Sequence, residues 1–198
     1  MKRFISVVLA FVLVLTFAVL AEELTPSKIL DDEIEVVSVE SMEPDVVIAD
    51  DFYIGPADEE ADKELSKGVL TDICEILNNN GNVTDYFDDE TKAAIEALLP
   101  EGVALEDLDL KEAGAIISVN YRSEYGDILA TFKYVTEYSP EQTLVGVVGI
   151  FETAESPVEW NVIEATAQED GTVVAIFPGE LVEKIEAAYE TVFMVLDK

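Results

Sequence analysis

The chain has 198 residues, of which 43 are acidic, 11 are Lys or Arg and none is His, so its formal net charge at pH 7 is −32. A charge this negative argues against nucleic acid and anionic membranes as partners, because both would repel it. The absence of His excludes Ser-His-Asp and Cys-His catalysis and His-ligated metal sites. Because Cys74 is the single cysteine, packing rather than intramolecular disulfides must stabilise the fold.

Residues 1–21 have the pattern of a secretory signal peptide. Lys2 and Arg3 form a basic start, an almost wholly apolar run follows, and Ala21 offers a small residue at the expected cleavage site. A membrane anchor is the alternative, but the run is near the lower length limit for a span and acidic residues follow it directly. We therefore expect a secreted or cell-surface protein, with no membrane contact after cleavage. Its nine remaining basic residues and 43 acidic ones would give it a net charge of −34.

Residues 22–62 form an acidic leader in which Lys28 is the only basic residue. Two apolar runs, Ile34–Val39 and Val46–Ala49, have the length of short edge strands, and the turn-like stretch Met42–Asp45 separates them. The sequence leaves open whether these runs join the folded domain.

Residues 63–112 show a helical pattern. Apolar residues recur there at steps of three and four and so share one face of a helix: Leu65, Val69, Ile73, Ile76 and Leu77. Cys74 lies beside this face, so we expect a buried, small apolar residue rather than a reactive thiol. A second helix is expected from Asp89 to Leu99, ended by Pro100, and a further helical turn within Leu105–Ala113.

From residue 113 onward the hydrophobic period changes to two, which predicts β-strands. The expected elements are strands at Ile117–Tyr121, Asp127–Tyr138 and Leu144–Phe151, a hairpin at Val158–Phe177, a helix at Pro178–Glu190 and a strand at Thr191–Leu196. The run Leu144–Phe151 is apolar on both faces, which predicts a central strand. Its two glycines indicate that something packs closely above it.

The hairpin at Val158–Phe177 is the clearest structural signal in the chain. Asp170-Gly171 suits a two-residue type I′ turn, which would place Ala167 opposite Val174 and Ala165 opposite Ile176. The apolar face would then consist of five residues: Ile163, Ala165, Ala167, Val174 and Ile176. Because a lone hairpin cannot bury such a face, it must belong to a larger sheet.

The order of helices followed by strands predicts an α+β fold. We expect an N-terminal helical portion (63–112) and then a β-rich domain (113–198), built as a mostly antiparallel sheet or an Ig-like β-sandwich with one late helix. The stretches GDILATFKYV, LVGVVGIF, VEWNVIEA and EDGTVVAIFP resemble the β-rich C-terminal portion of secreted or surface proteins of unknown function from Gram-positive bacteria. This resemblance implies an extracellular location, a sandwich-like sheet and an interaction or structural role, and it carries over no catalytic residues.

Two chemistries remain open to this composition, and calcium binding is the first. Asp and Glu oxygens are the ligands that a hard cation prefers. The best-placed acidic cluster comprises Asp85, Asp88, Asp89 and Glu90, in a short loop between the two expected helices. The plainer interpretation of such a cluster is a solvated loop or a charged helix N-terminus.

The second chemistry is carbohydrate recognition. It needs a pair of carboxylates across a cleft or an aromatic face that stacks on sugar rings. The aromatic candidates are Tyr121, Tyr125, Tyr134, Tyr138 and Trp160, for which core packing is the alternative.

No residue pattern in the chain identifies a catalytic nucleophile or a cofactor site. We therefore predict a non-enzymatic interaction or structural module at the cell surface, with an unknown protein or glycan partner. A carbohydrate-binding or carboxylate-based carbohydrate-active protein is the alternative. A third hypothesis is an inhibitor or accessory subunit that offers its acidic surface to a basic partner. The sequence leaves the oligomeric state open.

Overall fold

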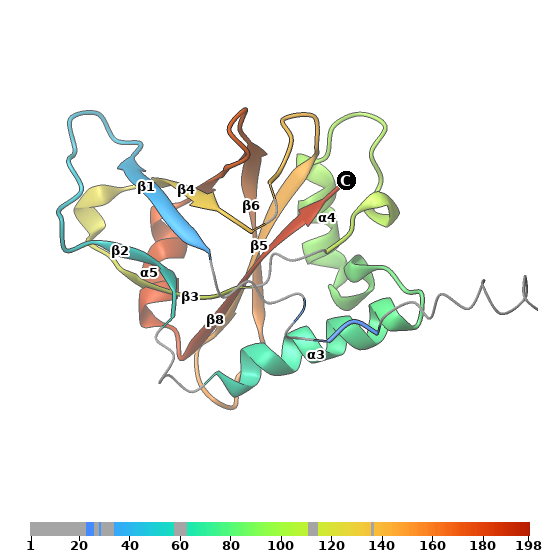
Figure 1. Cartoon of the computed structure of the whole chain (residues 1–198). Helices are drawn as coiled ribbons and strands as arrows, with labels where there is room; N and C mark the ends of the chain where they lie inside the picture. The colour runs from blue at the N-terminus through green and yellow to red at the C-terminus, as the bar shows by residue number, and fades with distance from the viewer. Residues whose placement is uncertain (1–22, 26–27, 29–33, 58–62, 111–114, 136) are drawn as a thin grey trace, which may run out of the picture.

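The structure is a computed structural model that describes residues 23–25, 28, 34–57, 63–110, 115–135 and 137–198 (Figure 1). The predicted signal peptide and much of the first part of the acidic leader lie outside these residues. No helix in the described part of the chain has the length and apolar character that a membrane span requires.

The described residues form an α+β fold, as predicted from the sequence. The strands are β1 (Glu35–Ser41), β2 (Tyr53–Pro56), β3 (Ala115–Asn120), β4 (Ile128–Lys133), β5 (Leu144–Phe151), β6 (Glu159–Ala167), β7 (Val173–Phe177) and β8 (Glu190–Asp197). The α-helices are α3 (Glu64–Asn78), α4 (Asp89–Leu98) and α5 (Gly179–Ala187). The strands follow the order β1-β4-β7-β6-β5-β8-β3-β2, and every neighbouring pair is antiparallel. Of the two expected arrangements of the β half, the structure thus has the antiparallel sheet.

The sheet curls so that its two outermost strands approach each other. Residues of β1, including Val36 and Val39, and residues around β2, including Phe52 and Ile54, line one shared hollow. Figure 1 shows β1 and β2 on the same side of the molecule. The curl encloses one face of the sheet, and the apolar core also includes buried residues of α3 and α4.

The first apolar run of the acidic leader joins the sheet as β1, but the second expected strand, Val46–Ala49, does not form. Val47 is 86% exposed, and the Ala49 N–H donates to the Tyr125 hydroxyl at 3.2 Å instead of to a neighbouring strand. The strand begins later, at Tyr53, and pairs with β3. The apolar pattern alone therefore did not predict which residues of this segment form the second strand.

Strand β5 lies between β6 and β8, and every one of its residues is buried, which confirms the predicted central strand. Its glycines allow the close approach that the sequence indicated. A Cβ atom on Gly149 would lie 2.5 Å from the Trp160 ring, and one on Gly146 would lie 2.6 Å from Ile163. Any larger residue at these positions would push β6 side chains away from the sheet.

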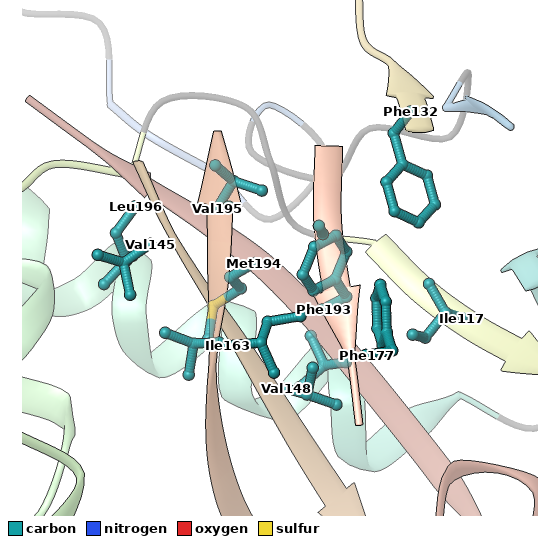
Figure 2. Close-up of a cluster of buried hydrophobic side chains, with 14 of the residues drawn as sticks. Ile117, Phe132, Val145, Val148, Ile163, Phe177, Phe193, Met194, Val195 and Leu196 are labelled. Atoms are coloured by element: carbon teal, nitrogen blue, oxygen red, sulfur yellow. The ribbon is translucent and has the colours of Figure 1, made fainter. Parts of the chain in front are cut away.

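The core on the enclosed face is aromatic at its centre (Figure 2). The ring centroids of Phe193 lie 5.7 Å from those of both Phe132 and Phe177. These three rings come from β8, β4 and β7, so they join strands from separate parts of the sheet. Tilted and edge-to-face aromatic pairs of this kind add about 0.5–1.5 kcal/mol beyond the apolar area that they bury.

Helix α3 is joined to the sheet by a buried carboxylate. Lys63, at the N-cap position, makes no side-chain cap. Instead, the Glu190 carboxylate at the start of β8 accepts the backbone N–H of Ser66 at 2.7 Å and that of Leu65 at 3.2 Å. A negative charge at a helix N-terminus is favoured by the free N–H groups and the helix dipole. The packed face of α3 includes Cys74, which is buried as predicted, and burial raises the pKa of its thiol.

The predicted hairpin forms as β6 and β7, but its register differs from the prediction by one residue. Gln168 N–H donates to Thr172 C=O at 2.8 Å, and Gly171, at φ +84°, donates to Gln168 C=O at 3.1 Å, so the loop has three residues. Ala167 therefore lies opposite Val173, and Ala165 opposite Ala175.

The extra loop residue changes which side of β7 faces the core. The buried residues are Val173, Ala175 and Phe177, whereas Val174 and Ile176, which the two-residue turn placed on the apolar face, are only partly buried. A shift of one residue reverses every side chain of a strand, because the side-chain period is two. Gly171 in a left-handed conformation after a tight turn is the usual signature of a three-residue hairpin loop.

Candidate functional site

A cleft of about 640 Å³ lies between the N-terminal half of α4 and the hairpin formed by β5 and β6. Four carboxylates line it: Asp88 and Glu90 from the start of α4, and Glu152 and Glu159 from the hairpin. Trp160 contributes an aromatic ring, and no lining residue is Lys or Arg. The cleft is thus acidic with one apolar wall.

The α4 side of the cleft is set by the capping of the helix. Asp88 is the N-cap residue, and its carboxylate accepts the backbone N–H of Thr91 at 2.8 Å. The hydrogen bonds from the Thr91 backbone and side chain lower the pKa of Asp88 below its ordinary value. Asp88 therefore remains ionised at neutral pH and presents a fixed negative charge to the cleft.

Trp160 is held rigidly in the wall. Its ring packs edge-to-face against Phe87 at a centroid distance of 5.1 Å and against Tyr86 at 5.9 Å, and it covers Gly149. Tyr86 and Phe87 lie immediately before α4, so this aromatic cluster fixes the distance between the helix and β6. The cleft is consequently a pre-formed feature of the fold.

The hairpin carboxylates lie where β5 ends and β6 begins. Glu159 Oε1 lies 2.6 Å from Lys184 Nζ of α5, an exposed ion pair that raises the pKa of Lys184. Glu152 and Glu159 also border a smaller hollow of about 220 Å³ beside α5. Among the described residues, Asp88, Glu90 and Glu152 form no ion pair, although Lys92 lies near enough to Asp88, and Lys184 near enough to Glu152, to attract them.

Two of the four residues of the calcium candidate, Asp85 and Asp88, cap helical segments. Asp85 accepts the backbone N–H of Asn82 at 2.9 Å in a capping box, and Asp88 caps α4. Asp89 and Glu90 lie in the first turn of α4, and only Asp88 and Glu90 of the four line the cleft. Within the described residues, no group of three or more Cys, Asp or Glu side chains is placed to hold a metal ion. The arrangement therefore gives the calcium prediction no support.

The proposed aromatic face for sugar binding does not exist as a surface. Tyr121, Tyr125, Tyr134 and Tyr138 are all buried, so these four tyrosines belong to the core. Trp160 alone of the five candidates reaches the cleft. The four tyrosines thus pack in the core, which was the alternative interpretation.

Sequence reasoning missed the cleft itself. Asp88 and Trp160 are separated by more than seventy positions in the chain, and no local pattern predicts that the segments around them lie side by side. The Tyr86-Phe87 pair directly before an acidic helix start was the one available signal, because two adjacent aromatics outside a strand need a packing partner.

Comparisons with protein-family models, with curated proteins and with solved structures found no match to this chain. The functional argument therefore rests on the geometry and charge of the cleft.

Proposed function

We propose that the protein is a secreted, non-catalytic interaction module that binds a basic segment of a partner protein in the cleft between α4 and the β5–β6 hairpin. The observation that carries the proposal is the lining of that cleft, which combines four carboxylates and an aromatic ring with no Lys or Arg. The proposal unites two of the hypotheses from the sequence: a surface interaction module and an acidic protein that receives a basic partner.

The charge of the whole chain supports a cationic ligand. A net charge of −32 creates a negative potential around the protein, and an acidic cleft focuses that potential. Such a field accelerates the approach of a basic partner and disfavours acidic ones. Trp160 adds a ring on which a Lys or Arg side chain can pack.

Asp88 is poorly suited to act as a catalytic acid. A carboxyl group that donates a proton at neutral pH needs a raised pKa, usually from burial. Asp88 shows the reverse shift, because the hydrogen bonds from Thr91 stabilise its charged form. With no His in the chain, general acid–base work would fall to such carboxylates.

The test measures how a Lys-rich peptide and a Glu-rich peptide of equal length bind to the purified protein. We expect only the Lys-rich peptide to bind, with an affinity that falls steeply as salt is raised, because exposed charges are screened beyond about 8 Å at physiological ionic strength. Replacing two cleft carboxylates, Glu90→Gln with Glu152→Gln, should weaken binding about three- to tenfold at low salt.

A matched control removes the same charge elsewhere. Glu35→Gln with Glu124→Gln changes two exposed carboxylates that do not line the cleft. If this control weakened binding as much as the cleft variant, the peptide would be attracted by overall charge and the cleft would not be the site.

A glycan ligand is the second candidate, and the position of Trp160 beside carboxylate acceptors favours it. A sugar complex should retard the protein in polysaccharide gels at all salt concentrations, because an uncharged ligand is not screened. Retardation by a neutral polysaccharide, together with no binding of the Lys-rich peptide, would replace the first proposal by the second.

A further inference from the structure

The sheet is incomplete beside the cleft. Strand β5 pairs with β6 from Glu159 to Ala165, but β7 pairs with β6 only from Ala165 to Ala167. β7 continues to Phe177, where it pairs with β4 alone. Among the described residues, the first part of β6 therefore has a neighbouring strand on one side only.

The alternation of an antiparallel ladder shows which backbone groups lie on the open side. Gln168 N–H bonds to Thr172 on the β7 side. Successive residues of a strand direct their N–H and C=O groups alternately to its two neighbours, so residues two apart point to the same neighbour. The backbone groups of Thr166, Val162 and Trp160 therefore point to the same side of β6 as those of Gln168. The backbone groups of Val162 and Trp160 thus point to the edge at which β7 no longer pairs.

This open edge is part of the acidic cleft. Trp160 and Val162 are both partly buried and both line it, opposite residues of α4. The five residues from Val158 to Val162 span about 13 Å at roughly 3.3 Å per residue, which matches about five residues of an extended peptide. An unpaired strand edge inside a cleft is the arrangement that β-strand addition uses.

We propose that an extended basic peptide adds to β6 as a further strand, in the gap beside β7. This inference rests on the proposed function and names the conformation and chemistry of the partner segment. Main-chain hydrogen bonds to Trp160 and Val162 give the peptide its register, and the cleft carboxylates select basic side chains.

The two faces of β6 define the pattern of such a peptide. Side chains opposite Trp160 and Val162 lie on the α4 face, where Asp88 and Glu90 line the cleft. The alternate side chains lie on the face of Glu159 and Asn161. Lys or Arg at every second position therefore meets the carboxylates of Asp88 and Glu90.

Asn161 adds an independent indication. Its Nδ2 atom is buried and has no hydrogen-bond partner among the described residues. A buried donor that lacks an acceptor is costly. An incoming strand with a Thr or Gln side chain beside Asn161 supplies that acceptor.

Charge also decides between a foreign peptide and a second copy of this chain. Pairing two copies through this edge would bring two acidic clefts together, each on a chain of net charge −32. Like charges directly across a strand pair are destabilising. The occupant is therefore a basic segment of another protein.

The experiment uses the purified protein and a capped octapeptide, Lys-Val-Lys-Thr repeated twice. Its matched control is the same peptide with N-methyl groups on its four central residues, which keeps every charge but removes four N–H donors. We expect the N-methylated peptide to bind about tenfold more weakly, because it loses main-chain hydrogen bonds. Hydrogen exchange at the Trp160 and Val162 amides should slow at least tenfold with the unmethylated peptide bound.

The outcomes separate this inference from the proposed function. Equal binding of both peptides, with binding still weakened in the Glu90→Gln, Glu152→Gln variant, keeps the basic-partner function and overturns strand addition. No binding of either peptide overturns both. Protection of the Trp160 and Val162 amides that rises with protein concentration in the absence of peptide would assign the edge to a second copy, against the proposal.

Discussion

Strands β6 and β8 flank the central β5, and they differ in burial and in the charges beside them. All residues of β8 are buried, although both of its ends carry carboxylates. The first part of β6 is only partly buried, has one paired side among the described residues and borders an acidic cleft. The difference separates the fully packed part of the sheet from the part to which we assign a ligand.

The buried charges of β8 are tolerated because each has a defined partner. Glu190 accepts two backbone N–H groups of α3, and Asp197 Oδ2 accepts from Gln142 Nε2 at 3.0 Å. The carboxylates beside β6 have no comparable enclosure, so they remain available to solvent or to a ligand. Buried charge in β8 therefore serves the fold, and exposed charge beside β6 serves binding in our proposal.

The largest expected effect comes from the core contact of β8. Phe193→Ala removes a fully buried ring that packs against Phe132 and Phe177, and should lower the free energy of unfolding by about 3–5 kcal/mol. Val162→Ala, at the partly buried start of β6, should cost only about 1 kcal/mol. Urea unfolding measures the free energy of unfolding of both variants. Equal losses in the two variants would show that β8 and the start of β6 contribute equally to stability.

A smaller effect is expected at the junction between β8 and α3. Glu190→Gln keeps the shape of the side chain but removes its charge, so the N–H groups of Leu65 and Ser66 lose a charge-assisted acceptor. We expect a loss of about 1–2 kcal/mol in urea unfolding at neutral pH. Glu183→Gln, an exposed neutralisation on α5, is the control and should change stability by less than about 0.5 kcal/mol. A similar loss in both variants would argue against the cap.

The smallest expected effect concerns Asp88 and depends on pH. Its pKa is lowered in the folded state, so its charge contributes stability above the ordinary value near 3.8, and this contribution disappears as the pH falls through the lower folded value. Asp88→Asn retains a capping oxygen but loses the charge. Its melting temperature should therefore lie below that of the unchanged protein at pH 7 and approach it below pH 3.8. A difference that persists at low pH, or that Asp50→Asn reproduces, would contradict the assignment.

The elements that were predicted well have a strong local period. The pattern around Ile73 predicted the helix that forms as α3, and the patterns of the second expected helix and of Leu144–Phe151 placed α4 and β5 within a residue of their observed bounds. Local pattern failed at residues 46–49, where the Ala49 N–H donates to the Tyr125 hydroxyl and the expected strand does not form. The hairpin register also failed, because the Gln168–Thr172 bond closes a three-residue loop around the predicted Asp-Gly turn.

By itself, the sequence determined the acidic charge, the absence of His-based chemistry, the α+β class and the positions of most helices and strands, because these depend on composition and on periodicity along a few residues. Only the tertiary structure decided that Glu190 caps α3, that β7 separates from β6 beyond Ala175, and that Asp88 faces Trp160 across a cleft. Such contacts join segments far apart in the chain, and their energies depend on how the whole sheet packs and closes rather than on the preferences of neighbouring residues.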